Sequence, residues 1–190
     1  FPTVEINSSF YRPHKPETYA RWADSVPDGF RFAVKVPRAI THDARLVEVD
    51  ELLDRFQGEA GMLGDKLGCL LVQLPPRFGF VDATAHAFFN TLRARFGCTV
   101  AFEARHPSWF SEPASALLRE CEVVRVIADP AAGQPGEHEP TSELAVYVRL
   151  HGTPRIYYSR YPADEIAAWR ARLETQAAAG RTVWCIFDNT

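Results

Sequence analysis

Seven short apolar runs in this chain each end in a charged or amide residue, and this pattern constrains the fold more than any other feature. The runs have the length and the β-branched and aromatic content of buried strands. They span residues 4–7, 32–35, 70–73, 100–106, 124–129, 146–151 and 183–189. A charge at the end of a buried strand costs free energy unless it is paired or hydrated. We therefore expect the polar ends to gather at the carboxyl edge of a parallel sheet, where α/β folds bind ligands.

Helical patterns lie between these runs. Helices are expected from Pro16 to Asp28, around Leu52–Phe56, from Asp82 or Thr84 to Phe96, over 113–122, and from Pro162 to Gly180. The segment 130–143 is rich in Pro and Gly, and is expected to be an exposed loop in place of a helix. The order of elements is therefore β(αβ), repeated within a single domain over residues 1–190.

Two α/β architectures have this order, an open doubly wound sheet and a barrel. A nucleotide-binding open sheet usually carries a Gly-rich first turn, which this sequence lacks, and here the polar ends are spread over all the strands. Both points favour a TIM-type (β/α) barrel. Such barrels have eight strands and typically about 250 residues. We therefore expect a barrel that lacks its first strand and its last helix in this chain.

The overall composition limits the kinds of partner that the protein is expected to bind. The formal net charge of -3 gives no general attraction to nucleic acid or to anionic membranes. No apolar run approaches the roughly 20 residues that a membrane-spanning helix needs. The four cysteines are scattered without a C-x-x-C pair, as expected for buried thiols in a reducing compartment. We expect a cytoplasmic protein that does not bind membranes, and the sequence predicts no oligomeric state.

Several segments in the same order resemble the YecE-like family, also called Domain of Unknown Function 72. They are Thr3–Tyr11, Phe30–Lys35, Leu74–Pro76, Phe102–Phe110 and Tyr147–Gly152. The likeness covers essentially the whole chain and implies a TIM-type barrel. Members of this family usually begin with a strand of the type Ile-Gly-Thr-Ser-Gly-Trp and finish with an Asn-rich segment and a helix, none of which this chain contains. The family has no settled activity, so the chemistry has to be inferred from the residues.

Strand side chains alternate between two faces, so residues two apart share a face. The pairs that do so are Glu5 and Asn7, Glu103 and Arg105, and Arg149 and His151. The residues expected to be catalytic are Glu5, Glu103, His151 and Asp188. Those expected to bind the substrate are Asn7, Tyr11, Lys35, Gln73, Arg105, His106, Asp129, Arg149 and Asn189. The alternative for the same set is a buried layer of ion pairs that only fills the barrel.

Residue chemistry suggests roles for these side chains. Either Glu5 and Glu103 or Glu103 and Asp188 are candidates for an acid–base pair of the glycosidase type. His151 is a candidate for a proton shuttle. The cations Arg105, Arg149 and Lys35 are expected to stabilise charge. Lys35 would form a Schiff base only if its amine were desolvated. We expect the neighbouring glutamates to keep it protonated instead, so that it pairs with or binds an anion.

The function expected from this set is hydrolase or isomerase chemistry on a small anionic or polyhydroxylated substrate. No dinucleotide fingerprint or local metal-ligand motif is present, so no cofactor is expected. A divalent metal held by dispersed ligands remains an alternative. Two further alternatives are a non-catalytic module that binds a small anion and metal-dependent processing of nucleic acid. The net charge of -3 disfavours the last of these, because it gives no general attraction to the phosphate backbone.

Overall fold

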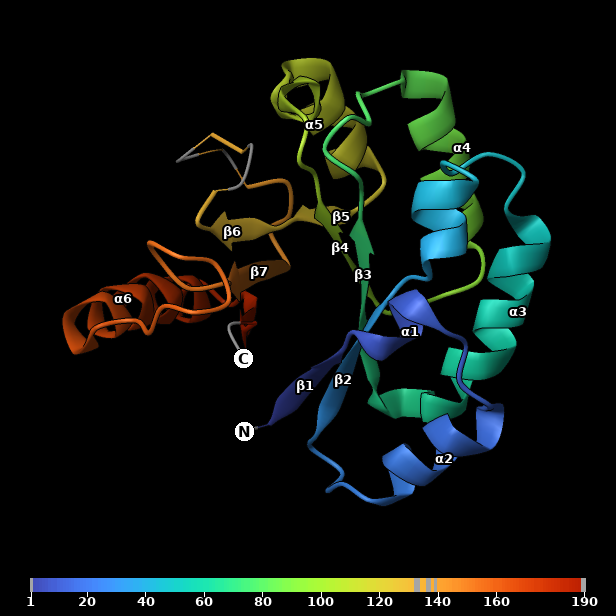
Figure 1. Cartoon of the computed structure of the whole chain (residues 1–190), viewed down its shortest axis with the longest axis horizontal. Coiled ribbons are helices and arrows are strands. Elements are labelled where there is room, and N and C mark those ends of the chain that lie inside the picture. Colours follow the sequence, from blue (N-terminus) through green and yellow to red (C-terminus); the bar gives the residue numbers. More distant parts are fainter. Residues whose placement is uncertain (1, 132–133, 136–137, 139, 189–190) are drawn as a thin grey trace.

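The strands form two parallel sheets (Figure 1). The structure is a computed structural model that describes residues 2–131, 134–135, 138 and 140–188. The five-stranded sheet has the order β1 (Thr3–Ile6), β2 (Arg31–Lys35), β3 (Leu67–Gln73), β4 (Thr99–Glu103) and β5 (Val123–Arg125). The three-stranded sheet has the order β6 (Ile127–Asp129), β7 (Ala145–Leu150) and β8 (Thr182–Phe187). The predicted α/β class is confirmed.

Helices lie between successive strands from β1 to β5 and between β7 and β8, as the sequence predicts, whereas β5 leads directly into β6 and the structure describes no helix between β6 and β7. They are α1 (Ser8–Tyr11), α2 (Pro16–Asp24), α3 (Asp50–Ala60), α4 (Asp82–Arg93), α5 (Glu112–Glu120) and α6 (Ala163–Ala178). Three short helical turns are η1 (Ala39–Asp43), η2 (Gly61–Lys66) and η3 (Pro107–Phe110). Figure 1 shows α2, α3 and α4 along one side of the five-stranded sheet, and α6 beside β7.

Alternation along the strands contributes to three apolar clusters, two of which include residues of the five-stranded sheet. Val34, Leu70 and Phe102 belong to the larger cluster, which also contains the buried faces of α3, α4 and α5. Ala33, Leu71, Ala101, Tyr147 and Trp184 belong to the second, to which β2, β3, β4, β7 and β8 all contribute. Full burial of one large apolar side chain contributes about 1.5–3 kcal/mol. The polar strand ends lie next to this second cluster.

The structure differs from the sequence-based expectations at four places. The run 124–129 is two strands in different sheets, separated at Val126, whose N–H bonds to the carbonyl of Phe102 at 2.9 Å. The run 100–106 leaves the sheet after Glu103. Asp82 is the first residue of α4 and makes no capping hydrogen bond. The short helix α1 carries too few residues for a periodic pattern and was not predicted.

A substitution at Gly68 in β3 tests how closely the second cluster is packed. A Cβ at this position would lie 2.7 Å from Cη2 of Trp184 and 3.0 Å from Cβ of Arg31. Because Trp184 is itself buried, we expect Gly68→Ala to lower the free energy of unfolding by about 1–3 kcal/mol. The matched control is Gly58→Ala in α3, where a Cβ meets open space and a gain of about 0.5–1 kcal/mol is expected. Urea unfolding measures both, and equal effects would contradict the packing.

Candidate functional site

Arg149 in β7 is the centre of a buried network of ion pairs. Its Nη1 lies 2.6 Å from Oε2 of Glu103, at the end of β4. Its Nη2 lies 2.7 Å from Oε1 of Glu5, in β1, and 2.6 Å from Oδ2 of Asp188, just after β8. The side chains of Arg149, Glu5 and Glu103 are each 1–2% exposed. One guanidinium therefore holds three carboxylates that are far apart in sequence.

Polar neighbours occupy the remaining oxygens of the two glutamates. Asn7 donates its side-chain amide to Oε1 of Glu5 at 2.9 Å, and the Tyr147 hydroxyl donates to Oε2 at 2.7 Å. Gln73, at the end of β3, donates to Oε1 of Glu103 at 2.7 Å, and Arg105 Nε donates to the same oxygen at 3.0 Å. Both glutamates are thus held in fixed orientations as hydrogen-bond acceptors.

The network sets the ionisation of its members. Burial alone would raise the pKa of Glu103, but Arg149 and Arg105 outweigh it and lower the pKa to about 2. Burial also opposes ionisation of Asp188, whose pKa is lowered by His151 and by Arg149. Burial works against the charge of Arg149, yet Glu103 and Glu5 keep the pKa of this guanidinium above its ordinary value. Glu103, Asp188 and Arg149 are therefore charged at neutral pH.

His151 follows β7 and is 2% exposed. Its Nδ1 lies 3.2 Å from Oδ2 of Asp188. The direction of that contact is poor, so neither ring nitrogen has a well-directed hydrogen bond to a described residue. A buried imidazole beside a carboxylate is able to accept or donate a proton when its Nε2 makes no hydrogen bond to a described residue.

Lys35, the last residue of β2, lies beside the same network. The residue is 7% exposed, and its Nζ lies 4.3 Å from the centre of the Phe10 ring. Burial lowers the pKa of Lys35 to about 8, assisted by Arg149, although Glu103 and Glu5 act in the opposite direction. The glutamates favour the charged amine, as the sequence suggests, and most of Lys35 is still protonated at pH 7, but burial has the larger effect on its pKa.

The structure thus brings together most of the residues predicted from the strand ends. The residues of this cluster are Glu5, Asn7, Lys35, Gln73, Glu103, Arg105, Arg149, His151 and Asp188. We call them the strand-end cluster. It spans both sheets, because Tyr147 and Arg149 of β7 contact Glu5 of β1 and Glu103 of β4, and Arg149 also contacts Asp188 just after β8.

Three predicted residues lie apart from the strand-end cluster. The ring of His106 bonds to Ser108 in the next turn, with Nδ1 2.7 Å from the hydroxyl, because the chain has left the sheet after β4. Asp129 accepts hydrogen bonds from Thr153 and from Tyr161, and so anchors the loop after β7. Tyr11 is 78% exposed at the end of α1. Asn189 lies outside the described residues.

Two residues that contact the strand-end cluster were not among the predicted site residues. Tyr147 shares the face of Arg149 by strand alternation, so the sequence contains the signal, but an apolar run hides a tyrosine hydroxyl. Phe10, whose ring lies under the amine of Lys35, comes from the short helix α1. No local pattern in the sequence relates it to β2.

Among the residues that the structure describes, no group of three or more His, Cys, Asp or Glu side chains lies close enough to hold a metal ion. The position between the three carboxylates of the strand-end cluster is taken by the Arg149 guanidinium. No helix among the described residues is both long and apolar enough to cross a bilayer.

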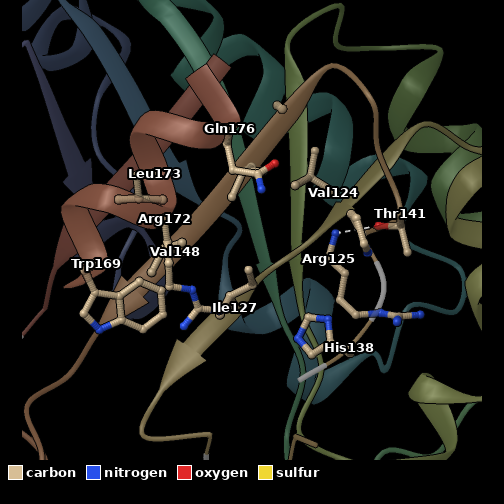
Figure 2. A pocket seen from close by; sticks show the side chains of 13 residues that line it. Val124, Arg125, Ile127, His138, Thr141, Val148, Trp169, Arg172, Leu173 and Gln176 are labelled. Carbon is tan, nitrogen blue, oxygen red and sulfur yellow. Dashed lines mark hydrogen bonds between the residues drawn. The ribbon is translucent and has the colours of Figure 1, made fainter. Parts of the chain in front are cut away.

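A separate cavity of about 170 Å³ lies between α6 and the strands β5, β6 and β7 (Figure 2). Trp169 and Leu173 of α6 face Ile127 and Val148 across it. The guanidinium of Arg125 contacts Ser115 and the Phe110 ring. The cavity borders the partly described segment 130–143, and it shares no residue with the strand-end cluster.

These features define an α/β protein of parallel strands whose ionisable side chains meet at the carboxyl ends of those strands. The chain belongs to the DUF72 family, described as a protein of unknown function, whose model matches residues 1–190. This confirms the family resemblance.

Bacterial relatives of the chain carry the name UPF0759. The chain is 35% identical to UPF0759 protein YecE of Escherichia coli (strain K12) over 113 residues, which are 59% of this chain and 41% of that protein. It is 26% identical to UPF0759 protein YunF of Bacillus subtilis (strain 168), in an alignment that covers the whole chain and 77% of the relative. The match to YecE therefore spans about two fifths of that relative's length.

Solved structures of the family share the fold. A DUF72 family protein of Enterococcus faecalis V583 superposes with a TM-score of 0.84 at 25% identity, over 100% of this chain and 83% of that one. A DUF72 family protein of Thermotoga maritima MSB8 gives a TM-score of 0.82 at 22% identity, over 100% of this chain and 78% of that one.

Proposed function

We propose that the strand-end cluster is the active site of an enzyme with hydrolase or isomerase chemistry. Its substrate would be a small anionic or polyhydroxylated molecule. The observation that carries the proposal is that Arg149 joins Glu5, Glu103 and Asp188, from strands far apart in sequence, in one buried network. Charges rarely lie at such depth without pairing or function.

The geometry supports a division of roles. His151 is the proton-transfer group, because its Nε2 has no hydrogen-bond partner among the described residues and Asp188 lies beside its Nδ1. Arg105, whose side chain is 26% exposed, and Lys35 are placed to bind the negative or hydroxyl groups of the substrate. The lowered pKa of Glu103 suits an electrostatic role, since it is a weak proton donor at neutral pH.

The same proposal includes the closure of the two sheets into a TIM-type (β/α) barrel. The second apolar cluster draws on strands of both sheets, as the interior of a barrel would. A cavity of about 310 Å³ separates β1 from β8, with Glu5, Asn7 and Asp188 in its lining. One further strand between these two edges would complete the ring and cover the cavity.

Substitution of His151 tests this function. The protein would be incubated with a panel of sugars, sugar phosphates and inorganic phosphate, followed by mass spectrometry of the products. For any turnover found, His151→Asn is expected to reduce the rate by about 10²–10⁴-fold. The control is His86→Asn on α4, an exposed histidine that pairs with Glu120.

The outcomes separate the proposal from its alternatives. Unchanged turnover in His151→Asn would remove this histidine from the mechanism. Saturable binding of one panel member without any product would favour the non-catalytic anion-binding module. Neither binding nor turnover would favour an ion-pair layer with a structural role only.

A further inference from the structure

Lys35 differs from every other charged member of the strand-end cluster. Within the described part of the chain, its ammonium forms no hydrogen bond and no ion pair, and it lies 4.3 Å from the centre of the Phe10 ring. Its backbone is fixed, because the Ser9 hydroxyl donates to the Lys35 carbonyl at 2.6 Å. A long side chain held without a counter-ion in a buried position is unusual for a structural lysine.

The nearby carboxylates are already engaged elsewhere. Both oxygens of Glu5 and both oxygens of Glu103 accept hydrogen bonds from other side chains. The charged or titratable groups that act on Lys35, or on which it acts, are Arg149, Arg105, Glu103, Glu5, Asp188 and His42. Two of them, Arg149 and Arg105, are guanidinium groups, which disfavour a further positive charge.

A buried amine in such a field is partly neutral near physiological pH. With a pKa of about 8, about one tenth of Lys35 is deprotonated at pH 7. An ordinary exposed lysine is almost entirely protonated at that pH. The free lone pair is what an amine needs in order to attack a carbonyl carbon.

We propose that Lys35 is a nucleophile that forms an imine with a small carbonyl compound carrying an anionic or hydroxyl group. This inference rests on the proposed function and names its substrate class. The lone pair of Nζ forms a bond to the carbonyl carbon, and the carbon–oxygen bond then breaks. The oxygen leaves as water with one proton from the amine and one from a donor. The protonated imine keeps the second proton of the amine.

His151 is the member of the cluster suited to supply and take back the proton that leaves with the oxygen. It is buried, and its Nε2 has no hydrogen-bond partner among the described residues. The partly exposed Arg105 is placed to hold an anionic group of the same substrate. Lys35, His151 and Arg105 would then provide nucleophile, proton carrier and anchor.

The composition of the chain makes the proposal easy to test, because it contains only the lysines Lys15, Lys35 and Lys66. Lys15 is exposed, and Lys66 donates to the carbonyls of Ala23 and Val26. The protein would be treated with glyoxylate or dihydroxyacetone phosphate, each with cyanoborohydride, which reduces imines to stable amines. Peptide mapping then gives the adduct at each lysine.

At pH 7 we expect the adduct at Lys35 to form about tenfold faster than at Lys15. The rate at Lys35 should level off above about pH 8, the value of its pKa. Labelling of Lys35 no faster than that of Lys15 would overturn the inference. Lys35→Arg keeps the positive charge without the nucleophile, so it should retain the melting temperature and lose the adduct.

The imine and the proposed function fail in distinguishable ways. Saturable binding or turnover of a panel compound without any adduct at Lys35 would overturn the imine and leave the active site in place, with Lys35 as an anion-binding cation. Absence of binding, turnover and adduct would overturn both. An adduct at Lys35 that persists in His151→Asn with unchanged rate would overturn the role of His151 as proton carrier.

Discussion

Replacing Arg149 with methionine is expected to lower the free energy of unfolding by about 3–5 kcal/mol, because removal of one partner leaves buried charges uncompensated. Arg149 is 1% exposed and contacts the carboxylates of Glu5, Glu103 and Asp188. Methionine fills part of the same volume but neutralises none of them. For a chain of this size, the loss corresponds to a fall in melting temperature of about 10 °C. Differential scanning calorimetry at pH 7 measures it.

Arg105→Met is the matched control. Arg105 bonds to the same Glu103 carboxylate, with Nη2 3.0 Å from Oε1, but its side chain is 26% exposed and water can replace it. We expect a loss of about 1 kcal/mol or less. Similar losses in the two variants would mean that Arg149 is also solvated. A wild-type melting temperature in Arg149→Met would show that the three carboxylates are not held as one buried network.

The meeting of polar side chains at one place could be predicted from the sequence, because it follows from strand polarity alone. A parallel α/β order puts all carboxyl strand ends on one side, so Glu103 and Arg149 meet although 46 positions separate them in sequence. Strand alternation correctly placed Asn7 beside Glu5. Neither inference needed the details of the loops.

The predictions that fail depend on where the chain leaves the sheet. Asp129 ends a strand, yet it turns to Tyr161 because the loop after β7 folds back over it. His106 follows a strand-like run, but the chain turns into η3 and His106 bonds to Ser108. The break at Val126 between the two sheets has no turn signal, since the run 124–129 contains neither Gly nor Pro. Tertiary contacts decide these cases, and local pattern does not encode them.

The pKa of Lys35 shows the same limit for electrostatics. From the sequence, the neighbouring glutamates are expected to keep this amine protonated. In the folded chain their oxygens are taken by Arg149 and other donors, and burial becomes the larger effect. Which charge pairs with which is a three-dimensional property, so residue types at strand ends predict membership of a site better than they predict roles within it.

Acid is expected to destabilise the protein mainly through Glu103. Its folded pKa of about 2 lies below the ordinary value of about 4.3 for an unfolded glutamate. The unfolded state therefore binds the proton more readily, and the stabilisation is fully present above the unfolded pKa and lost as the pH falls toward 2. The shift corresponds to about 3 kcal/mol. The midpoint of urea unfolding, measured from pH 6 down to pH 2, reports this loss.

Glu103→Gln separates this titration from that of the other acids. The variant should be less stable at pH 6, since Arg149 and Arg105 each lose a carboxylate partner, but its stability should fall less steeply between pH 4.5 and pH 2. Asp65→Asn replaces an exposed acid and should keep the wild-type slope. If Glu103→Gln also keeps the wild-type slope, proton uptake by Glu103 does not drive acid unfolding, and the ionised network around Arg149 is not what stabilises the strand ends.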